Sequence, residues 1–460
     1  MDIAERFAEN ALRSSYDRLP VAVVAATKRL ILDTVGAGFA GSSADAIDAG
    51  LALVRETGGA PQATVLVFGD RLPATSAAMI NGAMFQARDF DPVYEPGVML
   101  PYGPIVAATL AAAELSGAAG REFVHAVVLG SDMACRLGKS MMTGLGWSRT
   151  ATLGVFGAAL ACARLLRLDR DRTVSALGLA YSQAAGNIQS VIDGSHAKRY
   201  QGGFAAEAGL KAALLAARGV TGPRNVFEGR CGFFTVYESG KVHKDMVTEG
   251  LGEIYEGAAA SVKPYPCSRE HHGAVAAALR LHAEGVRAGD IESLTLRLTP
   301  NAFVLSGKPF RRGESHSIGD AISSAAYGAA VALVRGRVTL GDFQKEALQD
   351  GAVLELADRT RIEEDRSISD AKTLVPQAAS VRLRGGAVRE AVVTAMPGSP
   401  ESPLSPRELK EKFQACLAHS ARPVTSKRSD ALAESLENLE KLRNIGELQI
   451  HVSSQTGAKP

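Results

Sequence analysis

The chain has 460 residues, of which 46% are hydrophobic and 22% are charged. These proportions are typical of a folded globular protein of two or three domains and exclude a disordered chain. The 51 basic and 49 acidic residues leave a net charge of +2, so the chain has no overall field that would attract nucleic acid or an anionic membrane. We therefore expect neither of them as a partner.

The signals for export and for disulfide or metal binding are also weak. The first 20 residues carry acidic side chains and lack the apolar core of a signal peptide, and the longest apolar runs, such as residues 105–113, are too short to span a bilayer. The five cysteines are scattered, and no two have CxxC spacing. We expect a cytoplasmic protein without a zinc site or a disulfide framework.

From about residue 20 to residue 255, apolar residues recur at the three- and four-residue steps of helices. Leu30, Ile31, Val35 and Phe39, for example, form one stripe within a helix predicted over residues 21–39. One β-like segment, residues 63–68, interrupts the helices. The remaining helices of this part are predicted over residues 74–88, 104–115, 122–137, 152–165, 172–186 and 205–218.

The pattern changes near residue 290. Residues 291–298 alternate as in a strand, and residues 379–383 and 387–395 predict a hairpin around Arg384-Gly385-Gly386. Helices are predicted between these strands over residues 273–285, 318–335 and 340–348, and later over residues 407–418 and 430–442. The predicted fold class is mostly α with an inserted α+β domain. Residues 1–262 and 404–460 would form a large helical domain, and residues 263–403 a smaller α+β domain.

Two polar segments flank predicted helices in the large domain. Asp89 and Asp91 follow a helix C-terminus, where the helix dipole and burial would raise the pKa of a carboxyl group and suit it to act as a base. Lys198, Arg199 and Tyr200 lie in a glycine-flanked segment before a helix start, which is a plausible carboxylate site. Ordinary solvated loops are the alternative for both segments.

A third polar segment joins the two predicted domains. Its two prolines hold the backbone extended, so that Lys263 and Tyr265 project at defined positions, and Arg269 and His272 follow three residues apart. A rigid connector explains the prolines but not these four side chains, which favours a functional site. We expect Cys267 to be a buried structural thiol, although it could be a nucleophile.

No cofactor and no metal are expected. The sequence has no P-loop, no HExxH and no GxGxxG after a strand. Its histidines, cysteines and carboxylates lack metal-ligand spacing, and Asp89 and Asp91 alone would hold Mg²⁺ only weakly.

An ordered series of short motifs resembles the MmgE/PrpD family, which includes 2-methylcitrate dehydratases, cis-aconitate decarboxylases and iminodisuccinate epimerase. The resemblance extends from about residue 5 to residue 400. It implies a mostly helical large domain, a smaller α+β lid domain and a homodimer with the site in the cleft between the domains. The motifs that carry it are Leu32-Asp33-Thr34, Asn81-Gly82-Ala83 before Asp89-Phe90-Asp91, Thr150-Ala151-Thr152, Lys198 before Gly203-Phe204-Ala205, and Lys263-Pro264-Tyr265-Pro266-Cys267.

The resemblance and the polar segments together define one expected site. Lys198 and Lys263 should converge in one cleft, opposite Asp89 or Asp91. The full expected set comprises the catalytic residues Asp89, Asp91, Lys198, Lys263 and His272, and the substrate-binding residues Tyr265, Arg269, Arg199, Tyr200, Ser148 and Thr150.

The sequence departs from the family pattern at three histidine positions. A His-Pro pair of the lyase members is replaced by Leu100-Pro101, and two further histidines are replaced by Ser148 and Gln201. Val93 stands where a threonine is common. Imidazole is the usual acid or base near neutral pH, so carboxylates and lysines remain for that role.

These features predict an enzyme that abstracts a proton next to a carboxylate of a small di- or tricarboxylate. The expected class is a hydro-lyase similar to 2-methylcitrate dehydratase, or a related lyase. One alternative is an isomerase or epimerase of a dicarboxylate, similar to iminodisuccinate epimerase, which needs no leaving group. The other is a non-catalytic carboxylate-binding protein, because the three histidines are replaced.

Overall fold

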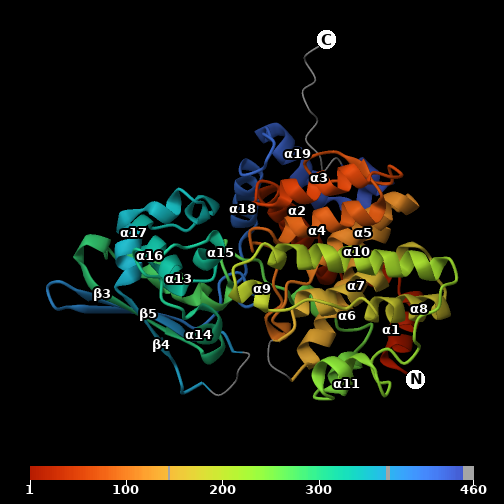
Figure 1. The fold of residues 1–460 in the computed structure, drawn as a ribbon, viewed down its shortest axis with the longest axis horizontal. Helices are drawn as coiled ribbons and strands as arrows, with labels where there is room; N and C mark the ends of the chain where they lie inside the picture. The colour runs from red at the N-terminus through yellow and green to blue at the C-terminus, as the bar shows by residue number, and fades with distance from the viewer. Residues whose placement is uncertain (143–145, 369–372, 449–460) are drawn as a thin grey trace, which may run out of the picture.

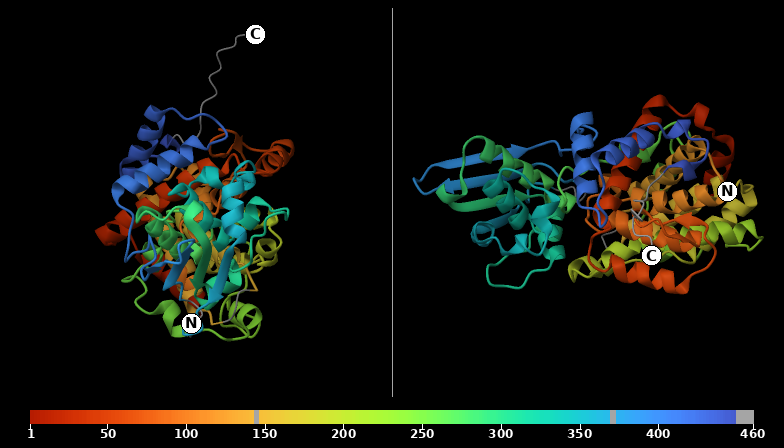
Figure 2. Two further views of the ribbon diagram at one scale, coloured as in Figure 1. Left: turned by 90° about the vertical axis from the view of Figure 1, so that its left-hand side faces the viewer. Right: turned by 90° about the horizontal axis from the view of Figure 1, so that it is seen from above.

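The computed structural model describes residues 1–142, 146–368 and 373–448 and has two lobes that lie side by side (Figures 1 and 2). The larger lobe is helical and contains the N-terminus. The smaller lobe combines a sheet with helices, and α18 lies at the junction of the two (Figure 1). The fold is therefore mostly helical with a small α+β domain, as predicted.

The larger lobe contains most of the helices. Its elements are α1 (Ile3–Arg13), α2 (Val21–Gly41), α3 (Ile47–Thr57), β1 (Ala63–Thr64), β2 (Arg71–Leu72), α4 (Ala74–Gln86), α5 (Tyr102–Ser116), α6 (Gly120–Ser140), α7 (Arg149–Leu165), α8 (Arg170–Tyr181), α9 (Gln189–Ile192), α10 (Ala197–Ala217), α11 (Phe233–Glu238) and α12 (Lys244–Thr248), with α18 (Pro406–Ala418) and α19 (Ser426–Glu437) near the end of the chain.

The core of the larger lobe surrounds α5. Every residue of this helix from Tyr102 to Ala113 is buried, and α4, α6, α7 and α10 pack around it. A helix that is apolar on all sides belongs in an interior, and its many alanines allow close approach of the neighbouring backbones. Among the described residues, none of the helices combines the length and the apolar character needed to cross a bilayer.

Two glycines bring α4 and α10 into backbone contact. A Cβ at Gly82 would lie 2.9 Å from the Cα of Gly203, and a Cβ at Gly203 would overlap the carbonyl oxygen of Met79. Only glycine allows this separation. The contact places the end of α4, which leads to Asp89, beside the first turn of α10, which carries Lys198.

The smaller lobe is built on a four-stranded sheet of order β4-β3-β5-β6. β3 pairs in parallel with β4, with Leu294 opposite Thr360, and antiparallel with β5, which forms a hairpin with β6. Leu294, Leu296 and Leu298 of β3 are buried in a core shared with α13 and α16. The elements are α13 (His272–Ala283), β3 (Ile291–Leu298), α14 (Pro300–Ser306), α15 (Ile318–Ile322), α16 (Ala325–Arg335), α17 (Gly351–Asp358), β4 (Thr360–Glu364), β5 (Gln377–Leu383) and β6 (Val388–Val393).

Several predicted elements differ from the structure. The helix predicted over 340–348 is wrong, because a Thr339–Asp342 capping box closes only one 3₁₀ turn and Gln344 is extended. The helix predicted over 318–335 breaks at Ser324, whose side chain accepts from the Tyr327 N–H and starts α16. Strand pairing within residues 63–68 is limited to the two residues of β1.

The chain returns to the larger lobe after β6, because α18 and α19 both pack against α2. The domain boundaries at 262/263 and 403/404 stay a prediction. Residues 449–460, which the sequence places in the large domain, lie outside the described part of the chain.

Candidate active site

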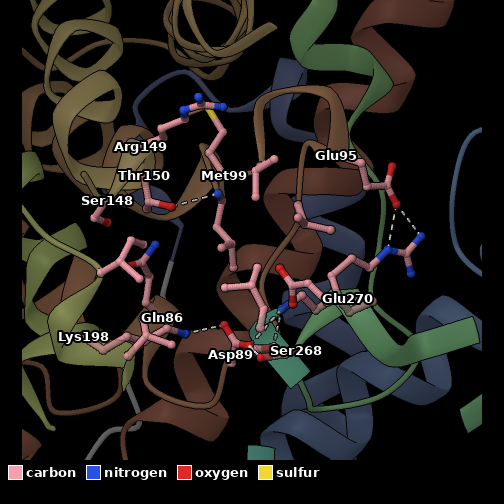
Figure 3. A pocket seen from close by; sticks show the side chains of 18 of the residues that line it. Gln86, Asp89, Glu95, Met99, Ser148, Arg149, Thr150, Lys198, Ser268 and Glu270 are labelled. Carbon is pink, nitrogen blue, oxygen red and sulfur yellow. Dashed lines mark hydrogen bonds and ion pairs between the residues drawn. The ribbon is translucent and has the colours of Figure 1, made fainter. Parts of the chain in front are cut away.

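A cavity of about 120 Å³ lies between the two lobes (Figure 3). Its walls come from the segment that follows α4, the starts of α7 and α10, the short helix α9, residues 263–270, α14 and the loop before β5. Of the predicted site residues, the cavity brings together Asp89, Lys198, Lys263, Arg269, Ser148 and Thr150.

Asp89 stands between the two predicted lysines. Lys198 Nζ contacts Asp89 Oδ1, and Lys263 Nζ lies 3.2 Å from Asp89 Oδ2. Lys263 Nζ also donates a 2.9 Å hydrogen bond to the Asp89 carbonyl oxygen. Burial alone would raise the pKa of Asp89, but the two lysine charges and their hydrogen bonds outweigh it and hold the pKa well below its usual range. The carboxylate is therefore ionised and anchors both cations.

Asp91 lies behind this cluster and is fully buried. Neither of its side-chain oxygens has a hydrogen-bond partner among the described residues, and Gly103 packs against one of them. Burial, reinforced by the charge of Asp89 and opposed by Lys263, raises the pKa of Asp91 to about 7. Asp91 does not line the cavity, so it can hold a proton near the cluster without touching a ligand there.

Arg269 links the wall of the cavity to His272. Its Nε donates a 2.7 Å hydrogen bond to Glu95 Oε1, and its Nη1 donates to the Pro397 carbonyl oxygen at 2.6 Å and lies 3.3 Å from His272 Nδ1. Burial, followed by the positive charges of Arg269 and Lys263, lowers the pKa of His272 well below its usual value. His272 is thus neutral and does not itself line the cavity, but it contacts Arg269, which does.

Glu270 is a cavity residue that the sequence analysis did not select. Its carboxylate has no hydrogen bond or ion pair with another side chain in the part of the chain that the structure describes, and Figure 3 shows it near Ser268 and Asp89. Burial raises the pKa of Glu270. The sequence indicated Glu270 only through its position next to Arg269 in the third polar segment.

Three predicted binding residues lie away from the cavity wall. Arg199 and Tyr200 follow Lys198 on α10, and successive helical positions are about 100° apart, so both side chains turn toward α3. The Tyr200 hydroxyl donates to the Ala46 carbonyl at 2.6 Å, and Arg199 donates to the Asp45 carbonyl. Tyr265 packs beside His272 instead, with the ring centroids 5.2 Å apart.

The positions where this chain departs from the family pattern all line the cavity. Leu100, Ser148, Gln201 and Val93 contribute to its wall. The Gln201 side chain makes two hydrogen bonds to the backbone of Asn187. It accepts from the Asn187 N–H at 2.8 Å and donates to the Asn187 carbonyl oxygen at 3.0 Å. It therefore holds the segment that leads into α9 instead of offering an acid or base.

The described residues offer few other groups that could bind a metal ion or act as a nucleophile. There, no cluster of three or more His, Cys, Asp or Glu side chains is arranged to hold a metal ion. Cys267 is buried, and burial raises the pKa of its thiol, so the thiol stays protonated.

Comparison with known proteins agrees with the fold. Residues 5–245 match the MmgE/PrpD N-terminal domain, and residues 265–438 match the MmgE/PrpD C-terminal domain. The chain therefore belongs to the MmgE/PrpD family.

The similar proteins include cis-aconitate decarboxylases and 2-methylcitrate dehydratases. The chain is 29% identical to the cis-aconitate decarboxylase-like protein oryM of Aspergillus oryzae, across 95% of this chain and 94% of that protein. It is 26% identical to the cis-aconitate decarboxylase of Homo sapiens, across 97% and 93%. Its similarity to the 2-methylcitrate dehydratase of Salmonella typhimurium is also 26% but covers 44% of this chain and 42% of that protein.

Proposed function

We propose that this protein is a lyase that releases CO₂ from a small unsaturated carboxylate bound at Lys198 and Lys263. The observation that carries the proposal is the pair of lysines on one ionised carboxylate, Asp89, at the wall of a cavity. The names of the similar proteins, decarboxylases and dehydratases, support a lyase, and the matches to oryM and to the Homo sapiens decarboxylase cover nearly the whole chain.

The lysines would stabilise the charge that develops during the reaction. When the bond to the leaving carboxylate breaks, its electron pair passes to carbon and delocalises through the neighbouring double bond into a retained carboxylate. Two fixed cations beside that retained group lower the energy of the transition state, because they are already oriented before the reaction begins. Asp89 holds both ammonium groups in place.

Glu270 would supply the proton that completes the reaction. Its carboxyl group lines the cavity, and burial raises its pKa, which favours the protonated form. It would donate a proton to the carbon that CO₂ has left and then take one back from water. This step needs one proton donor and no imidazole.

Dehydration fits these residues less well than decarboxylation. A leaving hydroxide needs its own acid, whereas CO₂ leaves as a neutral molecule. The cavity wall has Leu100, Ser148 and Gln201 at the three positions where the resemblance to the family's lyases implies histidine. A single carboxyl group can serve decarboxylation but leaves the hydroxide of a dehydration without assistance.

A turnover assay tests the proposal. The purified protein is incubated with cis-aconitate, 2-methylcitrate and other unsaturated or hydroxylated di- and tricarboxylates, and released CO₂ and water loss are followed by NMR. We expect CO₂ release that falls by at least about 100-fold in Lys198→Met. The matched control is Lys211→Met on the same helix, whose ammonium pairs with Glu207 at the surface.

We also propose a homodimer, on the resemblance to the family. Sedimentation at micromolar concentration tests it, with a mass of twice 48.1 kDa expected and a stable monomer contradicting it.

A further inference from the structure

Apolar side chains also line the cavity. Ile188 and Val191 come from the α9 segment, Leu305 from α14 and Leu374 from the loop before β5, so both lobes contribute. Val93 and Leu100, from the segment after α4, complete what we call the apolar wall. Most of these side chains are only partly buried, and all of them line the cavity.

Four cations line the cavity: Lys198, Lys263 and Arg269 pair with protein carboxylates, and Arg149 donates a hydrogen bond to the Gly97 carbonyl oxygen at 3.4 Å. Lys198 and Lys263 share Asp89, which leaves the three groups with a net charge of +1. Arg269 pairs with Glu95 at 2.6 Å. The remaining cavity carboxyl group, Glu270, would repel an anion whenever it is ionised.

This charge balance suits one or two carboxylates better than three. A carboxylate forced against the apolar wall would lose its hydration without gaining a hydrogen bond, which is a large cost. An alkyl or aryl group placed there would instead remove apolar surface from water, at about fourfold in affinity for each buried CH₂.

We infer that the substrate is a carboxylate that carries an alkyl or aryl substituent, with its charged end at Lys198 and Lys263 and its substituent on the apolar wall. This inference rests on the proposed function for the placement of the carboxylate and adds the class of substrate.

Calorimetric titration with a homologous series of non-reacting probes tests the inference. The probes are succinate, its 2-methyl, 2-ethyl, 2-propyl and 2-phenyl derivatives, and the tricarboxylate tricarballylate. We expect affinity to rise about fourfold per CH₂ up to propyl, and tricarballylate to bind at least about tenfold more weakly than propylsuccinate.

The chain offers matched controls on two helices. Leu305→Ser and Val191→Ser remove part of the apolar wall, whereas Val304→Ser and Ile192→Ser change neighbouring residues that do not line the cavity and are 78% and 66% exposed. The rise in affinity along the succinate series should become smaller in Leu305→Ser and Val191→Ser. It should be unchanged in the two control variants. If affinity rises by the same factor per CH₂ in both pairs of variants, the inference is overturned.

Lys263→Met separates this inference from the proposed function. If the wild-type series is flat and tricarballylate binds best, while Lys263→Met weakens every probe, the apolar wall is not a binding surface and the proposed lysine site stands. If neither succinates nor tricarballylate bind the wild type, both proposals are overturned. A rising series that Lys263→Met weakens uniformly supports both.

Discussion

Lys263 contacts Asp89 through both the side chain and the backbone of that residue. Its Nζ lies 3.2 Å from Oδ2 and donates to the carbonyl oxygen at 2.9 Å. Asp89 has φ of 51°, a left-handed conformation that is uncommon for a residue other than glycine. The bond to the carbonyl helps to hold that conformation, so Lys263 both neutralises Asp89 and orients it.

The two lysines should therefore respond differently to replacement by methionine. Both variants should lose turnover, but Lys263 has a side chain that is 1% exposed, whereas that of Lys198 is 30% exposed. We expect Lys263→Met to lower the free energy of unfolding by about 3 kcal/mol, and Lys198→Met to lower it by less than about 1 kcal/mol. Urea unfolding measures both, and equal losses would contradict the dual role of Lys263.

Glu270→Gln should reduce turnover by at least about 100-fold while carboxylate binding changes less than about threefold. The wild-type proton donor must be protonated, so turnover should fall as pH rises through the raised pKa of Glu270. Glu270→Asp should keep part of the activity and the same direction of pH dependence. A pH–rate profile whose alkaline fall is unchanged in Glu270→Gln would exclude this role.

Asp91 should make the protein less stable as pH rises from about 4 to about 7. Its pKa is raised from 3.8 to about 7 in the folded state, so within this range the folded state binds more protons than the unfolded state. Asp91→Asn removes this dependence. The free energy of unfolding of the variant relative to the wild type should therefore be higher at pH 8 than at pH 5, by more than about 1 kcal/mol. The same difference at both values would show that Asp91 is ionised throughout.

Gly203→Ala should disturb the site by separating α4 from α10. Its Cβ would overlap the Met79 carbonyl oxygen, so we expect a loss of about 1–3 kcal/mol in stability together with reduced turnover, because Lys198 moves with α10. Gly351→Ala is the control, since a Cβ there meets open space at the start of α17. If Gly203→Ala behaves like Gly351→Ala, the backbone contact does not position Lys198.

Regular patterns and ordered motifs predicted much of the fold and several of the residues that line the cavity. The alternation of Leu294, Leu296 and Leu298 predicted β3 at its observed bounds, and the three polar segments predicted Asp89, Lys198 and Lys263. β4 was not predicted, because an edge strand of sequence Thr-Arg-Ile-Glu-Glu has no apolar alternation.

The rest of the site depends on three-dimensional placement. Glu270 was missed because its place at the cavity wall depends on the fold and not on a pattern in the sequence. Arg199 and Tyr200 were included because they adjoin Lys198 in sequence, but the rotation of α10 turns them away. The apolar wall combines residues from four separate segments, so it is visible only once the chain is folded.

The most direct measurement of the central claim is NMR of turnover in D₂O with the panel of unsaturated and hydroxylated di- and tricarboxylates. The account predicts a product that lacks one CO₂ and carries one deuterium at the carbon that CO₂ left, and it predicts that Lys263→Met does not form this product. Deuterium in recovered or epimerised substrate without loss of CO₂, or loss of water in its place, would contradict it.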